Sequence, residues 1–149
     1  MTNNRLQVVG GVLQPQSVPV FQRTLPLWSR LEVLELRSCM VDDTCLAVLV
    51  QAFPQLPHLG VLDLRRNLLG DTGAEHLART MPLCKALEAL DVSNNYIGDK
   101  GVALLARGAE ASPCVWSLRL AGNKLSPEGA RWVSSAVLHT QGRLCDVSM

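Results

Sequence analysis

The chain has 149 residues and a mass of 16.2 kDa, which suits one compact domain but not two. Hydrophobic residues make up 48% and charged residues 18% of the sequence, which excludes an intrinsically disordered chain, and the aromatic content of 4% predicts an aliphatic core. The net charge of +1, from 14 basic and 13 acidic residues, argues against a protein that binds nucleic acid or an anionic membrane surface.

The N-terminal segment lacks the features of a membrane helix or a signal peptide. Its apolar stretch over residues 6–13 is interrupted by Gly10 and Gly11, and no run in the chain approaches the ~18 apolar residues of a membrane span. Three arginines but no acidic residue precede Glu32, as in mitochondrial targeting segments. The five cysteines, an odd number without C-x2-C spacing, favour reduced thiols over disulfides or a metal site. We expect a cytoplasmic protein, with a mitochondrial location as the minority alternative.

A repeated pattern covers almost the whole chain. The motif L-x-x-L-x-L-x-x-N/C-x-L, with Val or Ile at some Leu positions, occurs at a constant spacing of 28 residues in residues 31–41, 59–69, 87–97 and 115–125. The same spacing places an earlier copy near residue 3, with Gly11 where Asn or Cys is expected, and apolar residues from 144 onwards predict a closing strand. We expect a single domain over residues 1–149, with five repeats that start near residues 3, 31, 59, 87 and 115 and a partial strand from 144.

The second half of each repeat has a helical pattern. Gly73, Gly101 and Gly129 are each followed four residues later by Leu or Val, whereas Ser17 and Cys45 stand at the same position in the first two repeats. With the strand motif, this G-x-x-x-L segment resembles the leucine-rich repeats of the ribonuclease-inhibitor type. The resemblance implies an α/β leucine-rich-repeat solenoid (arc), with parallel β-strands on its concave face and α-helices on its convex face.

Alternation of apolar residues in each motif sends every second strand side chain inward. Cys39, Asn67, Asn95 and Asn123 follow the strands and are expected to turn inward, where their side chains bond backbone groups of the turn. Among the helices, Ser126-Pro127-Glu128 is a strong start signal. Asp43, Asp71 and Asp99 occupy the position of Pro127, which suits the first helical turn. Pro19 is expected to shorten the first helix or delay its start.

The concave strand positions are the first candidate for a functional surface. One column predicts an acidic line of Glu35, Asp63 and Asp91 on neighbouring strands, beside the basic residues Arg37, Arg65 and Arg66. Two interpretations stay open: cross-strand ion pairs on a hydrated surface, or a polar strip that recognises a protein partner. Because no His, Ser or Cys nucleophile joins these columns, we expect neither catalysis nor a bound metal or cofactor.

A second candidate is the column just past the Asn position, which we term the rim row: Val12, Met40, Leu68, Tyr96 and Lys124. A contiguous row of exposed apolar residues is typical of an interface. Trp116 either extends this apolar surface at the opposite end of its strand or packs against a neighbouring return loop.

The ends of the predicted solenoid are the third candidate surface. The last helix, over residues 127–137, has no successor, so Trp132, Val133, Ala136 and Val137 are expected to stay uncovered, beside a strand edge formed by Leu144, Val147 and Met149. We expect at least one end of the solenoid to be covered by a partner subunit or a second copy.

These observations predict a non-enzymatic protein–protein interaction module, a small scaffold or structural subunit of a larger assembly, without a cofactor. The alternative is a regulator, of the inhibitor or GTPase-activating type, of a small GTPase or another enzyme. An immune-receptor fragment is a third possibility, although nucleotide-binding and effector segments are not found. The candidate partner-binding residues are Met40, Leu68, Tyr96, Glu35, Asp63, Asp91, Arg37, Arg65, Arg66, Trp116 and Trp132.

Overall fold

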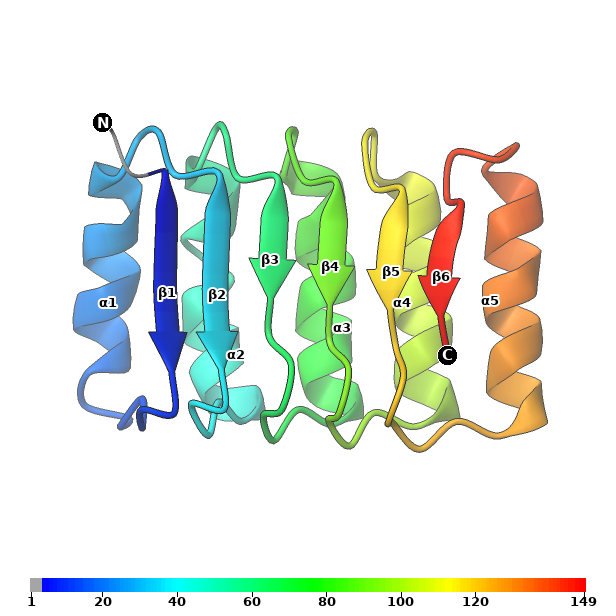
Figure 1. The fold of residues 1–149 in the computed structure, drawn as a ribbon, viewed down its shortest axis with the longest axis horizontal. Coiled ribbons are helices and arrows are strands. Elements are labelled where there is room, and N and C mark those ends of the chain that lie inside the picture. The colour runs from blue at the N-terminus through cyan, green and yellow to red at the C-terminus, as the bar shows by residue number, and fades with distance from the viewer. Residues whose placement is uncertain (1–3) are drawn as a thin grey trace.

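Strands and helices alternate along the chain and lie in two layers (Figure 1). The computed structural model describes residues 4–149, so the repeat start predicted near residue 3 lies outside the described part. The strands are β1 (Arg5–Val9), β2 (Val33–Arg37), β3 (Val61–Asp63), β4 (Ala89–Asp91), β5 (Ser117–Arg119) and β6 (Asp146–Ser148). The α-helices are α1 (Val18–Thr24), α2 (Asp43–Leu49), α3 (Asp71–Thr80), α4 (Asp99–Ala111) and α5 (Pro127–His139). Short 3-10 turns follow the first three helices: η1 (Leu25–Leu27), η2 (Phe53–Gln55) and η3 (Met81–Leu83).

The strands form one parallel sheet in which each strand pairs with the next along the chain. Leu34 lies opposite Leu62 and Leu62 opposite Leu90, so the strands pair at the 28-residue spacing of the motif. The last pairing, of Leu118 with Val147, is offset by one additional residue. The helices cover one face of the sheet, and the opposite face forms the concave surface (Figure 1). The predicted fold class, an unclosed α/β solenoid, is therefore confirmed.

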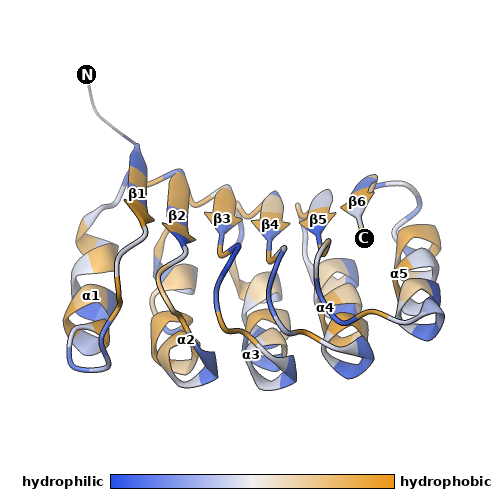
Figure 2. Cartoon of the chain, turned by 60° about the horizontal axis from the view of Figure 1, so that its bottom comes forward, coloured by the Kyte–Doolittle hydropathy of each residue, from blue (hydrophilic) through white to orange (hydrophobic). Residues whose placement is uncertain are grey.

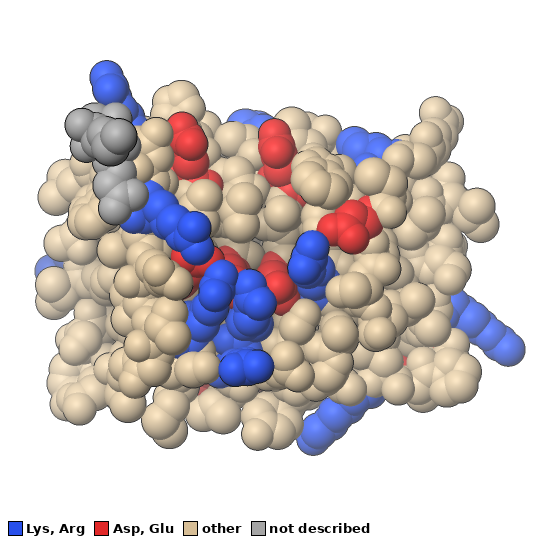
Figure 3. Space-filling model, viewed as in Figure 1, with Lys and Arg blue, Asp and Glu red and all other residues tan. Residues whose placement is uncertain are grey.

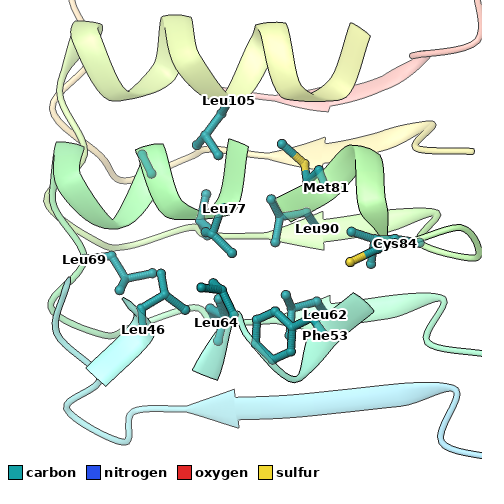
Figure 4. Close-up of a cluster of buried hydrophobic side chains, with 14 of the residues drawn as sticks. Leu46, Phe53, Leu62, Leu64, Leu69, Leu77, Met81, Cys84, Leu90 and Leu105 are labelled. Atoms are coloured by element: carbon teal, nitrogen blue, oxygen red, sulfur yellow. The ribbon is translucent and has the colours of Figure 1, made fainter. Parts of the chain in front are cut away.

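An aliphatic core fills the space between the two layers. The strands carry many of the apolar residues (Figure 2). Leu62 and Leu90 point toward Phe53 and Leu77 of the helical layer (Figure 4), and all four side chains are fully buried. Each such side chain stabilises the fold by about 1.5–3 kcal/mol through burial. The expectation of a core built from aliphatic residues is confirmed.

Asparagine side chains at the strand ends bond the turns of two successive repeats together. Asn67 Nδ2 donates to the carbonyl oxygens of Leu36 at 2.7 Å and Leu64 at 2.9 Å, while its Oδ1 accepts from the backbone N–H groups of Cys39 at 3.0 Å and Val41 at 3.1 Å. Asn95 and Asn123 make corresponding bonds one and two repeats later, as the sequence predicts. These bonds satisfy backbone groups that the solenoid buries.

Cys39 occupies the same inward position in the second repeat. Its Sγ lies 3.3 Å from the carbonyl oxygen of Val8 and 3.2 Å from that of Arg37, so the thiol replaces only part of the asparagine's bonding. Burial raises the pKa of the Cys39 thiol, although a backbone hydrogen bond from Gly11 opposes this effect.

The helix starts follow the expected chemistry. Ser126 caps α5 by accepting a hydrogen bond from the backbone N–H of Glu128 at 3.2 Å, with Pro127 in the first turn. Helix α1 begins only at Val18, with Pro19 in its first turn, whereas the other helices begin at the position equivalent to residue 15. The expected delay of the first helix is therefore observed.

A feature the motif does not reveal links each helix to the next repeat. Asp71 Oδ1 accepts hydrogen bonds from the backbone N–H groups of Gly98 at 2.8 Å and Gly101 at 3.1 Å, so a side chain on α3 caps the start of α4. Asp43 and Asp99 bind the N–H of the corresponding N-cap residue of α3 and α5. We term Asp43, Asp71 and Asp99 the carboxylate ladder. A Cβ at Gly101 would lie 2.5 Å from Asp71 Oδ1, which explains why glycine occupies this helical position.

The apolar residues at the C-terminal end of the solenoid are better covered than the sequence predicts. At the C-terminal end, Val133, Ala136 and Leu144 are buried, because they point into the core formed by α4, α5 and the sheet. The prediction that Val133 and Ala136 stay uncovered is therefore wrong, whereas Trp132 on the same helix is exposed. β6 is nevertheless an edge strand, and Met149 is exposed.

The N-terminal end is the less well covered of the two. Leu6, Val8, Leu13 and Phe21 occupy core positions of the first repeat but are only partly buried. Val20 on α1 is 61% exposed. The first repeat therefore presents apolar surface at the end of the solenoid.

Candidate functional site

The acidic line predicted on the concave face is present in the sheet. Glu35 lies opposite Asp63, and Asp63 opposite Asp91, on β2, β3 and β4. Their exposure, however, differs from the expectation: Glu35 and Asp63 are each 3% exposed and Asp91 is 9% exposed. The prediction that these acids are exposed is wrong, because long arginine side chains from the same and neighbouring strands lie over them. Figure 3 shows basic side chains above recessed acidic atoms near the centre of this face.

Arginines and carboxylates alternate in a continuous network across four repeats, from β1 to β4. Arg5 Nε donates to Glu35 at 2.6 Å, and Arg37 joins Glu35 to Asp63, whose Oδ2 lies 2.7 Å from Arg37 Nε. Arg65 Nη2 lies 2.7 Å from Asp63 Oδ2. A further contact of 3.6 Å joins Arg65 Nε to Asp91. Each carboxylate therefore has a cation beside it, which removes the mutual repulsion expected for three like charges on adjacent strands.

The network shifts the ionisation of its central pair. Desolvation by burial acts to raise the pKa of Asp63, but hydrogen bonds from Arg65 and Arg37 together outweigh it and hold this pKa below its usual value. The hydrogen bond to Asp63 is the largest of the effects that raise the pKa of Arg65. Both groups stay charged at neutral pH, so this central pair is ionic.

The groups that reach solvent are the guanidinium groups rather than the acids. The side chains of Arg5 and Arg65 are 51% and 36% exposed, while the side chains of Glu35 and Asp63 are 4% exposed. Arg66 follows β3, is exposed, and makes no side-chain ion pair within residues 4–149. The accessible charge at the centre of the concave face is therefore positive although the chain as a whole is nearly neutral.

The rim row lies beside this network, at the ends of the strands. Met40, Leu68 and Tyr96 are 55%, 41% and 53% exposed, as the sequence predicts. Consecutive members sit on adjacent turns, because the Leu68 N–H donates to Val41 and the Tyr96 N–H donates to Leu69. The Lys124 ammonium lies 5.3 Å from the centre of the Tyr96 ring. The exposed apolar row is thus contiguous, and its role in binding a partner stays a prediction.

The two candidate tryptophans lie elsewhere. Trp116 precedes β5, at the opposite ends of the strands from the rim row, and its Nε1 lies 3.5 Å from a carboxylate oxygen of Glu88 in the neighbouring repeat. Trp132 is on α5 and lines a hollow of about 400 Å³ between α4 and α5. The structure therefore brings the acids, the arginines and the rim row together but separates both tryptophans from them.

Comparison with known proteins agrees with this geometry. A family model described as "Leucine Rich repeat" matches residues 55–78 and 84–106. The chain has the leucine-rich-repeat fold. The ribonuclease-inhibitor type is compatible with its repeat length and its helical convex layer. No curated protein sequence gives a significant match.

Several solved structures share the leucine-rich-repeat fold of this chain. The domain described as Leiomodin-1 Actin-Binding Site 2 is 12% identical, with a TM-score of 0.77 over 91% of this chain and 79% of that one. The C-terminal domain of tropomodulin from Caenorhabditis elegans is 14% identical, with a TM-score of 0.76 over 94% of this chain and 85% of that one. An internalin from Listeria monocytogenes is 18% identical, with a TM-score of 0.54 over 84% of this chain and 30% of that one.

The described part of the chain offers neither a metal cluster nor a membrane-spanning helix. Within residues 4–149, no group of three or more His, Cys, Asp or Glu side chains is arranged to hold a metal ion. In the same part of the chain, no helix is long and apolar enough to cross a membrane. Burial raises the pKa of the Cys84 thiol to about 11, which keeps this thiol protonated and unreactive at neutral pH.

The sequence did not reveal two features of this surface. Arg5 was not a candidate, although its side chain extends the network to β1 by binding Glu35. The recessed position of the acids was also missed. One signal was available in the sequence. Arg37 and Arg65 each stand two residues after an acid of the line, Glu35 and Asp63, which places each arginine on the same face of the sheet as its acid.

Proposed function

We propose that this leucine-rich-repeat protein is a non-catalytic protein-binding module that serves as a small scaffold subunit of a larger assembly. The observation that carries the proposal is the contiguous exposed row of Met40, Leu68 and Tyr96 beside the arginine network. Exposed apolar side chains on three adjacent repeats are costly in water, and an interface would cover them. Each lies on a turn fixed by an inward Asn, so the row is preorganised for binding.

The structural neighbours support protein binding as the general function. The leiomodin domain is described as an actin-binding site, and it has the same fold at similar size. Actin is therefore a defined partner to test with this chain. The poorly covered first repeat supports a second contact, in which a partner subunit or a second copy covers the N-terminal end of the solenoid.

The test is a variant in which Met40, Leu68 and Tyr96 are all changed to Ser. We expect it to lose at least ten-fold in recovery of partners by affinity purification from native cells, with an unchanged circular dichroism spectrum, because the three side chains are exposed. A control on other surfaces changes two exposed apolar residues, Leu83 and Leu138, to Ser. Equal recovery by both variants would refute the role of the rim row.

Two further measurements examine the partners themselves. Co-sedimentation with filamentous actin tests actin directly, and binding that the rim variant retains would place actin on another surface. Light scattering at high micromolar concentration tests self-association. A monomer at all concentrations would exclude a second copy as the cover of the N-terminal end.

A further inference from the structure

The concave face combines accessible cations with recessed anions, and this arrangement selects a kind of partner. The acceptor atoms of the acids are already used: Asp63 Oδ1 accepts from the backbone N–H of Arg65 at 3.1 Å, and Asp91 Oδ1 accepts from the N–H of Ser93 at 3.0 Å. With Asp63 only 3% exposed, a cationic partner would find no free carboxylate at the centre of this surface.

The arginines, in contrast, retain unused donors. Arg37 binds its acids through Nε and Nη2, and Arg65 also uses Nε and Nη2. Within the described residues 4–149, the Nη1 group of each makes no hydrogen bond, and Arg66 makes no ion pair. Outward donors are thus available on two adjacent strands, which are about 4.8 Å apart in a sheet. A planar guanidinium binds carboxylates through two parallel hydrogen bonds.

Burial of the acids also makes the arginines better binding groups. An exposed arginine loses side-chain entropy when a ligand immobilises it, at a cost of about 0.5–1.5 kcal/mol. Arg37 and Arg65 are already held by Asp63, at 2.7 Å in both cases. Part of this cost is therefore met in folding, before a partner arrives.

The apolar rim row adjoins these donors. Leu68 lies two residues after Arg66 in the same turn, and Met40 lies three residues after Arg37. A ligand on the arginines therefore reaches the apolar row without leaving the surface. A nucleic acid fits this surface poorly, because buried carboxylates under the arginines repel a continuous phosphate chain and the apolar row offers phosphates no partner.

We propose that the concave face binds an acidic peptide segment of a protein partner, with carboxylates on Arg37, Arg65 and Arg66 and an apolar side chain on the rim row. This inference rests on the proposed function, whose partner class it names. The expected segment has several Asp or Glu residues beside a Leu, Ile, Met or aromatic residue.

The test is selection of random twelve-residue peptides on the folded chain by phage display. We expect the selected peptides to be enriched in Asp and Glu, with at least one large apolar residue. Synthetic copies of these peptides should bind the Arg66→Gln variant about ten-fold more weakly, which is the order expected for the loss of one charge-assisted hydrogen bond. Their affinity for the parent chain should fall as salt is raised from about 50 to about 300 mM, because salt screens the charges. Arg66 is the best position to change, because it is exposed and its loss leaves no buried acid unpaired.

Control measurements keep the outcome decisive. Arg107→Gln, which removes a positive charge from α4, should leave peptide binding unchanged. Selection of neutral or basic peptides, no selection at all, or equal binding by Arg66→Gln would overturn the inference. A twelve-nucleotide single-stranded RNA that binds in an Arg66-dependent manner and competes with the peptides would overturn it in favour of nucleic acid.

The failure of this inference is distinguishable from that of the proposed function. If partner recovery depends on the rim row but the selected peptides are not acidic, the binding module stands and the acidic partner is wrong. If acidic peptides bind through Arg66 but the rim variant recovers partners normally, the charged surface binds and the role of the rim row is wrong.

Discussion

Replacing the inward asparagines by alanine tests whether these side chains stabilise the solenoid through buried hydrogen bonds. Asn67→Ala removes the acceptor from two buried backbone N–H groups, those of Cys39 and Val41. Asn95→Ala removes the acceptor from one, that of Leu69. The carbonyl oxygen of Leu64 accepts from both asparagines, so it keeps one bond in either variant.

These contacts set the expected magnitudes. An unsatisfied buried backbone group costs about 1–3 kcal/mol. Asn95→Ala should therefore lower the free energy of unfolding by about 1–3 kcal/mol, and Asn67→Ala by about 2–6 kcal/mol. Asn67→Ala also removes the hydrogen bond to the carbonyl oxygen of Leu36, whereas the carbonyl oxygens of Leu64 and Val92 each keep a bond from another asparagine in Asn95→Ala. Both differences make Asn67→Ala the more costly variant.

Urea denaturation followed by circular dichroism measures both values. The parent and an exposed control, Gln55→Ala, should agree within about 0.5 kcal/mol. If Asn67→Ala and Asn95→Ala cost the same, or if each costs less than about 0.5 kcal/mol, the count of buried N–H groups does not explain the stability and the reasoning fails.

Three further outcomes follow from the packing and ionisation of the core. Gly108→Ala should destabilise the protein by about 1–3 kcal/mol in thermal melts, against the usual helix preference for Ala, because its Cβ would lie 2.8 Å from the backbone of α3. Because the pKa of Asp63 is lower in the folded state than in the unfolded state, its ionised carboxylate stabilises the fold above the unfolded pKa, and this stabilisation is lost as pH falls through the folded pKa. In urea denaturation at a series of pH values, Asp63→Asn should therefore lose less stability than the parent below pH about 4. At pH 8, a thiol reagent should modify Cys114 and Cys145 rapidly and the three buried cysteines only on unfolding, with Cys84 among the slowest because its pKa is about 11; modification of Cys84 at the rate of an exposed thiol would contradict its burial.

The repeat period predicted the fold because one spacing fixes several properties together. A 28-residue step with apolar residues at fixed positions determines which side chains face inward and which strands pair. The inward role of Asn67 followed from the same pattern, since a polar residue at a buried strand end needs backbone partners. The exposure of Met40, Leu68 and Tyr96 followed because each stands next to an inward residue.

The charged surface could be predicted only in part. The pattern placed Glu35 and Asp63 on the concave face, but it carries no information about how far the neighbouring arginines reach over them. Trp116 and Trp132 lie apart from this charged surface, because Trp116 precedes β5 and Trp132 lies on α5 in the helical layer.

The carboxylate ladder was also missed, since its bonds join residues 27 positions apart rather than neighbours. Asp43 precedes Gly70, and Asp71 precedes Gly98, by this same interval. A search for Asp paired with Gly at that spacing would have found these two pairs, although not the third, in which Asp99 binds Ser126.

The carboxylate ladder makes unfolding from the two ends of the solenoid affect the helix caps differently. Asp71 on α3 caps α4, but no side chain on α4 caps α3, so each helix cap comes from the preceding repeat. The asparagine bonds run the other way, since Asn67 holds the turn of the repeat before it. Loss of an early repeat leaves the next helix start without its acceptor, whereas fraying from the C-terminal side leaves every earlier cap in place. In a nearest-neighbour description of repeat folding, the caps and the asparagine bonds both belong to the interface energy between successive repeats. An exchange of whole repeats between such proteins should therefore keep the accepting aspartate together with the glycine whose N–H it binds across the junction.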